Sequence, residues 1–328
     1  MEIKLWAVNN SANQATGSGP GGGPLITVAI CTHNRAAYLD EAIRSVLAQI
    51  HDDTELLVVD NASTDNTAQV VRQFASHQPP VVGIYEARPG ISFARNTAFL
   101  KARGRYVLFL DDDATAEPGW LAAYQQFLSH PLSTKIAVLG GAVHPRYEAP
   151  RPGWISAIEN SYDLGNQAFC YGRQDSPWEC NNAYHREIAI AQGMFDVRLG
   201  PVGNALSYYE GADFNLRLQD AGYEIWWVPG AGIQHTFHAN RMNLRWYLRS
   251  AFATGVSAAR KRLKFAGGPR QRAILRIGRL VATPFHCLIN LAIFLVLYPA
   301  GKPAPAVGAL RRAMRAAGFG WQLLKPVS

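Results

Sequence analysis

The sequence predicts an α/β fold, in which a mixed, mostly parallel sheet is flanked by helices and followed by a basic helical extension. Short apolar runs alternate with segments whose apolar residues recur at helical spacing. Polar residues follow several of these runs directly. All 24 acidic residues lie within residues 1–240, whereas residues 241–328 hold half of the 32 basic residues and no acid. A chain of 328 residues is long enough for one large domain and an appendage.

The predicted elements follow one another in a regular order after residues 1–24, a Gly/Ser/Pro-rich lead that we expect to be flexible. Strands are predicted at LITVAI (25–30), ELLVVD (55–60), VVGIYEA (81–87) and RYVLFL (105–110). Helices are predicted over 36–49, from Ser63 or Thr64 to about Ala75, and over 92–102. Strands that alternate with helices in this way form parallel sheets covered by helices.

Polar side chains stand where three of these strands end. Thr32 and Asn34 follow the first strand, Asp60 ends the second, and Asp111 to Asp113 follow the fourth. Ligands of open parallel sheets bind beyond the carboxyl ends of the strands. Three adjacent carboxylates repel one another unless a cation lies among them. The alternative is a solvated acidic turn that caps the next helix, and the convergence of the three strand ends favours a ligand site.

Four segments carry a resemblance to a known family. VAICTHNRAAYLDEAIRSVL, ELLVVDNASTDNT, GISFARNTAF and GRYVLFLDDDATAEPGW resemble, in this order, successive blocks of the family-2 glycosyltransferases, which have the GT-A fold. The resemblance extends from about Ile26 to Trp120 and continues more weakly to about Arg241. It implies a GT-A glycosyltransferase domain over 25–240, with a nucleotide-binding half (25–120) and an acceptor half (121–240).

The resemblance also implies the ligands. A divalent cation, Mn or Mg, would be held by Asp111, Asp113 and His235. The donor, a nucleotide-diphosphate sugar, would occupy a pocket that includes Thr32, Asn34, Asp60, Arg95 and Asp111. Two of these residues have simpler interpretations. Arg95 could be an ordinary surface residue of a helix, and His235 could be an ordinary residue at the end of a strand. Residues 145–195, including Trp178 and Asn181, are expected to shape the acceptor cleft.

The general base is expected near the start of a helix in YYEGADFNLRLQDAGY. An acceptor hydroxyl needs a carboxylate that takes its proton during attack. Glu210 is the first candidate and Asp213 the second. Family members usually place two adjacent acids where this chain has Glu210 and Gly211, and both candidates also suit the first turn of a helix, where acids stabilise the dipole. A single displacement inverts the anomeric centre, which is also what the resemblance implies.

Two other functions compete with sugar transfer. VLFLDDDAT matches the Asp-x-Asp-x-Thr pattern of haloacid-dehalogenase-like phosphatases, although that chemistry places its motif near the first strand and needs a later acidic motif. A nucleotide-sugar-binding protein without catalysis is the other alternative, because Gly211 replaces an acid.

Residues 241–328 form the basic, partly apolar helical tail, which we expect to associate with an anionic membrane surface. The stretch from Leu280 to Tyr298 has the length of a membrane span, but Pro284, His286 and Asn290 interrupt it and basic residues flank both ends. It could span, form a shallow hairpin, or be a buried helix. VGALRRAMRAAGF (307–319) would lie at the interface or pack on the protein.

The predicted location is cytoplasmic, with peripheral or monotopic attachment to the cytoplasmic membrane face, because the N-terminus lacks a secretory signal pattern. No nucleic-acid recognition module accompanies the basic tail, so nucleic acid is not an expected partner. The expected reaction is hexosyl transfer to a glycan or lipid-linked acceptor, in the synthesis of cell-surface polysaccharide or glycolipid.

Overall fold

The computed structural model describes residues 25–51, 54–130, 133–155, 161–173, 175–200 and 209–325. The predicted flexible lead over residues 1–24 lies outside these ranges. The chain divides into two units. The first comprises Met1–Arg146, Ser161–Gly203 and Asp213–Thr236, and the second comprises Tyr147–Asn160, Asn204–Ala212 and Phe237–Ser328.

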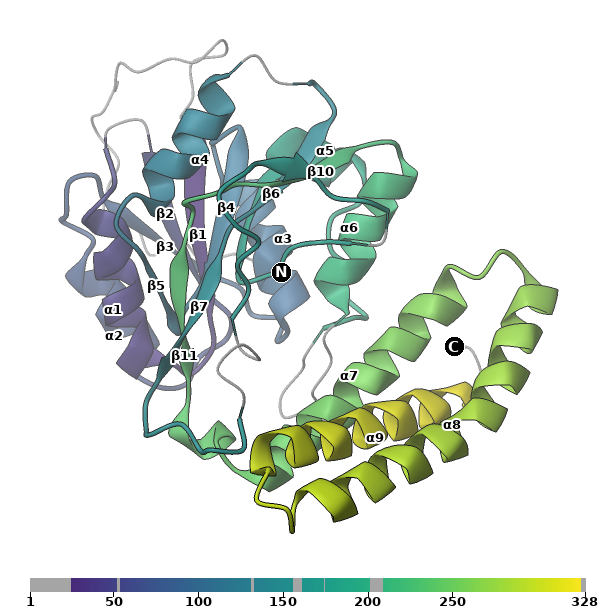
Figure 1. The fold of residues 1–328 in the computed structure, drawn as a ribbon. Coiled ribbons are helices and arrows are strands. Elements are labelled where there is room, and N and C mark those ends of the chain that lie inside the picture. Colours follow the sequence, from purple (N-terminus) through teal and green to yellow (C-terminus); the bar gives the residue numbers. More distant parts are fainter. Residues whose placement is uncertain are drawn as a thin grey trace. The chain divides into compact units, whose positions relative to one another are not determined.

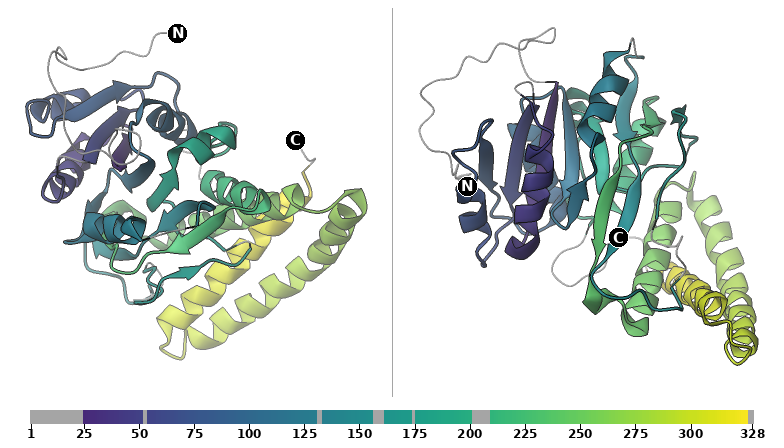
Figure 2. Two further views of the ribbon diagram at one scale, coloured as in Figure 1. Left: turned by 90° about the horizontal axis from the view of Figure 1, so that it is seen from above. Right: turned by 60° about the vertical axis from the view of Figure 1, so that its left-hand side comes forward.

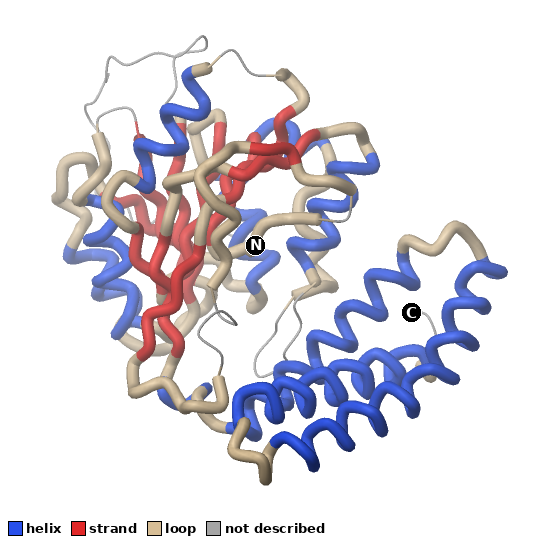
Figure 3. The backbone as a smooth tube through the Cα atoms, viewed as in Figure 1, coloured by secondary structure: helices blue, strands red, loops and turns tan. Residues whose placement is uncertain are grey.

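The first unit is built on a large mixed sheet (Figures 1 and 3). In the described part of the chain its strands have the order β3 (Val81–Tyr85), β2 (Thr54–Asp60), β1 (Ile26–Thr32), β4 (Tyr106–Asp111), β9 (Asn181–His185), β6 (Ile136–Gly140), β10 (Glu224–Trp227) and β8 (Phe169–Cys170). Strands β3, β2, β1 and β4 are parallel, β9 is antiparallel to both β4 and β6, and β8 is antiparallel to β10. The predicted mixed, mostly parallel sheet is therefore confirmed.

Helices cover both faces of this sheet (Figure 2). One face packs against α1 (Ala36–Leu47), α2 (Thr67–Gln73) and α4 (Trp120–Ser129), and the other against α3 (Ile91–Lys101), α5 (Arg186–Ala191) and α6 (Glu210–Asp220). The alternation of side chains along β1 serves both faces, because Val28 and Ile30 enter the first core and Ala29 and Cys31 the second. Burial on both faces explains why the strands are continuous apolar runs.

One predicted helix begins later than expected. We predicted a start at Ser63 or Thr64, whereas α2 begins at Thr67. The amide of Asn34 donates to the Ser63 hydroxyl (3.0 Å), and the Thr64 amide donates to Oδ1 of Asn34 (2.7 Å). These contacts hold the segment in a loop, and the Asp65 carboxylate instead accepts a hydrogen bond from the Thr67 amide (3.0 Å).

A small sheet lies in the order β5 (Ala114–Ala116), β11 (Ile233–Phe237) and β7 (Val143–Tyr147) among the described residues. Strands β5 and β11 are antiparallel, with His235 opposite Ala114. The Thr236 amide donates to the main-chain oxygen of Asp113 (2.9 Å). This pairing brings a histidine that is distant in sequence to the end of the aspartate triplet.

The second unit contains the helical extension, consisting of α7 (Leu244–Lys264), α8 (Pro269–Leu297) and α9 (Pro303–Leu323), after a short 3-10 turn at Ala239–Arg241. Helix α9 packs against both α7 and α8, and Figure 2 shows α8 and α9 side by side. Glycines allow α7 and α9 to approach closely, because a Cβ atom on Gly255 or Gly318 would lie 2.0 Å from a main-chain oxygen of the other helix. Helix α9 thus packs on the protein, and the expected helical extension is confirmed.

Candidate active site

The candidate site in the first unit begins with three strand ends that the sheet aligns. Thr32 pairs with Asp60 in the register of β1 and β2, and Cys31 pairs with Asp111 in the register of β1 and β4. The polar residues predicted from the sequence therefore lie at the same edge of the sheet. This edge is where open α/β sheets bind ligands.

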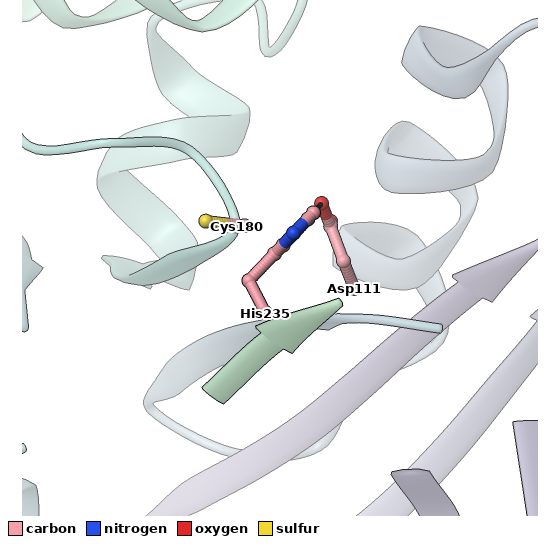
Figure 4. A group of neighbouring side chains, drawn as sticks. All are labelled: Asp111, Cys180 and His235. Atoms are coloured by element: carbon pink, nitrogen blue, oxygen red, sulfur yellow. Dashed lines mark ion pairs between the residues drawn. The ribbon is translucent and has the colours of Figure 1, made fainter. Parts of the chain in front are cut away.

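Asp111, Asp113 and His235 converge at this edge. Nε2 of His235 lies 3.5 Å from Oδ2 of Asp111 and 3.3 Å from Oδ1 of Asp113. Figure 4 shows the side chains of Asp111 and His235 directed toward one another. Neighbouring ligands of an octahedral ion with bonds of about 2.1 Å are roughly 3 Å apart, so the spacing of these atoms fits a divalent cation. Two carboxylates and an imidazole suit such an ion chemically.

Cys180, which precedes β9, was not predicted from the sequence and joins this group. Its Sγ atom and the ligand atoms of Asp111 and His235 all lie within 4.8 Å of one another. Burial raises the pKa of the Cys180 thiol well above its usual range, and Asp111 and Asp113 add to the increase. The thiol is therefore neutral, and hard cations prefer the oxygen atoms beside it.

Arg35 compensates part of the negative charge of the triplet. Its Nη1 atom contacts Oδ2 of Asp113 and lies 3.3 Å from Oδ1 of Asp112. Burial nevertheless raises the pKa of Asp112 to about 7, and Asp113 and Asp111 act in the same direction, whereas Arg35 and the Thr32 hydroxyl lower it. One arginine is not enough to keep this buried carboxyl fully ionised, so the site favours an additional positive charge.

Arg95 is a buried residue of α3, which excludes the simpler interpretation of a surface arginine. It is 5% exposed. Its guanidinium lies 3.7 Å from Oδ1 of Asp111 and 3.8 Å from Oε2 of Glu179. It also lies over the ring of Phe195, 5.4 Å from the ring centroid. Arg95 is thereby held against the side of Asp111.

Asn34 and Asp60 shape the loop that follows β2. Oδ1 of Asp60 accepts a hydrogen bond from the Ser63 amide (2.9 Å), and Oδ1 of Asn34 accepts one from the Thr64 amide (2.7 Å). Asn34 has a left-handed backbone (φ 54°), which asparagine tolerates better than most residues. Both side chains thus support the loop, at the edge where the donor pocket is predicted.

Asn61 has a role that the sequence alone did not reveal. Its Nδ2 atom donates to the main-chain oxygens of Glu86 (3.2 Å) and Arg88 (2.6 Å), and its Oδ1 atom accepts from the Gly90 amide (2.7 Å). Gly90 has φ 132° at the start of α3. An aspartate at this position would supply no donor for the two carbonyl oxygens. The amide therefore ties the end of β2 to the loop before α3.

The two candidate bases differ in their surroundings. Asp213 is fully buried (0% exposed) in α6, and its Oδ2 atom accepts a hydrogen bond from Nε of Arg217 (3.1 Å). Glu210 is the first residue of α6 and belongs to the second unit. It is 4% exposed, and its Oε2 atom accepts a hydrogen bond from the Tyr209 amide (3.1 Å). The surroundings of Asp213 are those of a structural ion pair.

Asn181, which we expected at the acceptor cleft, is an internal residue. Its Nδ2 atom donates to the oxygens of Ala142 (2.9 Å) and Ala231 (2.8 Å), and its Oδ1 atom accepts from Trp120 (2.7 Å) and Tyr124 (3.0 Å). Its amide group is fully used in these bonds. Asn181 therefore holds neighbouring segments together, and that expectation was wrong for this residue.

Comparisons with known proteins agree with this architecture. The family model "Glycosyl transferase family 2" matches residues 27–193. The chain is 26% identical over 251 residues to the succinoglycan biosynthesis protein ExoM of Rhizobium meliloti, covering 75% of this chain and 78% of that protein. It is 23% identical over 239 residues to the glucosyl-dolichyl phosphate glucuronosyltransferase of Haloferax volcanii, covering 71% and 75%.

A solved structure shares the fold. The mannosyltransferase PcManGT of Pyrobaculum calidifontis, in complex with GDP-Man and Mn2+, is similar with a TM-score of 0.58 and 21% identity, covering 89% of this chain and 86% of that chain. This likeness confirms the predicted GT-A fold. The family match covers half of the chain and includes the strand ends and the aspartate triplet described above. The chain therefore belongs to glycosyl transferase family 2.

Proposed function

We propose that this protein transfers a hexosyl group from a nucleoside-diphosphate sugar to a hydroxyl of a glycan or lipid-linked acceptor, with inversion, in polysaccharide or glycolipid synthesis. The observation that carries the proposal is the convergence of Asp111, Asp113 and His235 at the carboxyl edge of the sheet. The names of two relatives, one in succinoglycan biosynthesis and one acting on a glucosyl-dolichyl phosphate, support the acceptor class.

Asp111, Asp113 and His235 are the residues proposed to hold a divalent cation, Mn or Mg. When bound, such a cation neutralises the charge that develops on the diphosphate leaving group. Arg35 and Arg95 flank the triplet and orient the carboxylates through the contacts described above. The related fold that was solved with GDP-Man and Mn2+ supports this assignment.

Thr32, Asn34 and Asp60 are the proposed donor-pocket residues, together with Arg95 and Asp111. Their support is the shared strand register, which aligns the ends of β1, β2 and β4. Asp60 is the residue proposed to read the base edge. Arg95 contributes through its contact with Asp111, because a buried guanidinium beside one carboxylate fixes that carboxylate in place.

Glu210 is the proposed general base. It takes the proton of the acceptor hydroxyl as that oxygen forms a bond to the anomeric carbon, while the bond from this carbon to the phosphate oxygen breaks and its electron pair leaves with the diphosphate. Attack opposite the leaving group inverts the centre. The complete burial of Asp213 and its bond to Arg217 favour Glu210 over Asp213.

The helical extension is proposed to attach the enzyme to the cytoplasmic face of a membrane. Helix α8 is, among the described residues, the one helix that is long and apolar enough to cross a membrane. Six of its exposed apolar residues recur on one side of the helix and form what we call the α8 stripe, namely Ile274, Ile277, Val281, Phe285, Leu288 and Leu295.

An interfacial position explains α8 better than a crossing. Nε of Arg312 in α9 donates to Oδ1 of Asn290 in α8 (2.9 Å), near the middle of the apolar stretch. If α8 crossed a bilayer, Arg312 would be carried into the hydrocarbon region, where a charged side chain is costly. A helix that lies in the interface would bury the α8 stripe in lipid and keep Arg312 among the head groups.

Turnover of the donor tests the proposed reaction. We expect nucleoside diphosphate to be released from one nucleotide sugar in the presence of Mn2+ or Mg2+ and a suitable acceptor. Asp113→Ala and Glu210→Gln should each abolish most of this release without unfolding the protein. Full release by Asp113→Ala would remove the cation assignment. If the wild type bound the donor without turning it over, the alternative of a nucleotide-sugar-binding protein without catalysis would be favoured.

The phosphatase alternative is overturned. The family match over residues 27–193 includes the aspartate triplet, so this motif belongs to a glycosyltransferase domain.

A further inference from the structure

The helical extension contains an open pocket of about 320 Å³ between α7, α8 and α9. Four arginines line it, namely Arg262 of α7, Arg279 of α8, and Arg312 and Arg315 of α9. We call this site the arginine pocket. Its volume lies at the lower end of the range of about 300–1,000 Å³ that is usual for small-molecule sites.

The positive charges of the arginine pocket are not neutralised by carboxylates of the extension. No carboxylate lines the pocket among the described residues, and residues 241–328 contain no Asp or Glu at all. Burial lowers the pKa of Arg262, and the neighbouring Arg279 and Arg315 lower it further. Like charges held together cost free energy unless an anion is bound between them.

Contacts within the extension hold three of the four guanidinium groups in place. Arg262 and Arg279 both lie over the ring of Phe319, at 5.7 and 5.4 Å from its centroid. Arg312 is held by its hydrogen bond to Asn290. Side chains fixed before binding lose little freedom when a ligand arrives, and the guanidinium fork matches the oxygens of a phosphate group.

The same helix carries the pocket and the apolar stripe on different sides. Arg279, Thr283 and His286 of α8 line the pocket and recur at helical spacing. Ile277 and Val281 belong to the α8 stripe and lie on another side of the helix. A helix whose apolar side is buried roughly 5–10 Å into the boundary of the acyl chains keeps its polar side among the head groups.

We propose that the arginine pocket binds the terminal phosphate of a membrane lipid. The inference rests on the proposed membrane location and adds a specific head group to it. A phosphate monoester carries a charge of about −1.5 to −2 near neutral pH, so it matches a cluster of four cations better than a singly charged diester does. Three acceptor oxygens are also available to several guanidinium groups at once.

Vesicle co-sedimentation of the full chain tests this proposal. Phosphatidylcholine vesicles would contain either phosphatidic acid, which has a terminal phosphate, or phosphatidylglycerol, a diester, at matched surface charge. We expect wild type to bind the phosphatidic acid vesicles about tenfold more tightly, since one or two charge-assisted hydrogen bonds account for such a factor. Arg279→Gln/Arg315→Gln should lose this preference.

Two further variants separate recognition from general attraction. Arg245→Gln/Arg270→Gln removes two exposed charges of α7 and α8 that do not line the pocket, so it should weaken binding to both vesicles and keep the preference. Arg279→Lys/Arg315→Lys keeps the charge but not the guanidinium fork, so it should reduce the preference while binding to phosphatidylglycerol stays close to wild type.

The proposal is overturned if wild type shows no preference at matched charge, or if both glutamine pairs lose it equally. It is also overturned if the protein, in the absence of vesicles, binds inorganic phosphate or pyrophosphate as tightly as it binds the lipid, since the site would then serve a free anion. Donor turnover by the same variants keeps the two proposals distinct. Inactive wild type that still prefers phosphatidic acid would refute the proposed reaction and leave the lipid site standing.

Discussion

Oδ2 of Asp213 lies 3.1 Å from Nε of Arg217, one turn further along α6. The Arg217 guanidinium also donates to the main-chain oxygens of Gln192 (2.6 Å) and Met194. The pair therefore fastens α6 to the segment that follows α5. A buried carboxylate that is bonded in this way contributes to stability. Substitution of Asp213 should therefore affect mainly stability, whereas substitution of Glu210 should affect mainly turnover.

Asp213→Asn should lower the free energy of unfolding by about 1.5–3 kcal/mol, because it removes a charge-assisted hydrogen bond inside the protein. Denaturant unfolding measures this loss. Glu210→Gln should destabilise less but lower kcat by about 10²- to 10⁴-fold, which is the usual contribution of a general base. If Asp213→Asn left stability unchanged and abolished turnover, Asp213 would be the base.

Asn61→Asp should destabilise the first unit by about 1–3 kcal/mol. The carboxylate would face the oxygens of Glu86 and Arg88, which now accept hydrogen bonds from the amide. Asn66→Asp is a matched control, because Asn66 is exposed at the start of α2, where an acid is favourable. Thermal unfolding of the two variants should differ clearly. Equal melting temperatures would contradict the proposed tie between β2 and α3.

Binding of Mn2+ should strengthen as the pH rises through about 7. The Asp112 carboxyl, whose pKa is raised to about 7, holds a proton below this pH. A nearby cation favours the ionised carboxylate, so binding releases this proton and becomes weaker, by up to about tenfold per unit, as the pH falls below 7. Titration calorimetry at several pH values measures this effect.

Asp112→Asn should flatten this pH dependence. The variant keeps the contribution of His235, which must also be neutral to bind a cation, so the difference from wild type isolates Asp112. Stability without metal should change in the opposite direction. Between about pH 4 and 7 the native protein holds a proton that the unfolded chain has lost, so ionising Asp112 lowers stability as the pH rises. Identical pH profiles for variant and wild type would refute this role.

Ile277→Glu/Leu288→Glu should detach the protein from membranes while leaving it folded. The two side chains are 67% and 63% exposed, so a polar replacement removes little packing within the protein. Two charges on the α8 stripe oppose its burial in lipid. Co-sedimentation with anionic vesicles measures the loss, and Ile277→Ala/Leu288→Ala is a milder control. Unchanged sedimentation of the glutamate variant would refute the interfacial position of α8.

The sequence was sufficient to predict the parts of the fold that local patterns encode. The apolar runs and the polar residues that follow them indicated β1 to β4 and the sheet edge at which Asp60 and Asp111 both lie. The position of His235 required the family resemblance, because its neighbour in the small sheet is Ala114, which is far away in sequence.

The missed residues depend on contacts between distant segments. In the sequence, Arg35 is simply the residue that precedes a predicted helix, yet its guanidinium contacts the aspartate triplet. Asn61 directly follows a predicted strand, and Asn181 was expected at the acceptor cleft, yet the amides of both bind main-chain and side-chain partners inside the protein. No periodicity distinguishes such internal asparagines from residues that contact a ligand. Capping propensity favoured a start of α2 at Ser63 or Thr64. Hydrogen bonds that join both residues to Asn34 keep this segment in a loop instead.

Metal-dependent donor binding tests the central claim most directly. The melting temperature of wild type and of Asp113→Ala would be measured with a panel of nucleoside diphosphates and nucleotide sugars, each with and without Mn2+ or Mg2+. A ligand at a hundred times its Kd adds about 2.7 kcal/mol to the free energy of unfolding, which is readily seen. We predict an upward shift for one nucleotide that requires the metal and is lost in Asp113→Ala. If no nucleotide shifted wild type, or if the shift persisted in the variant, the proposed donor and cation site would be contradicted.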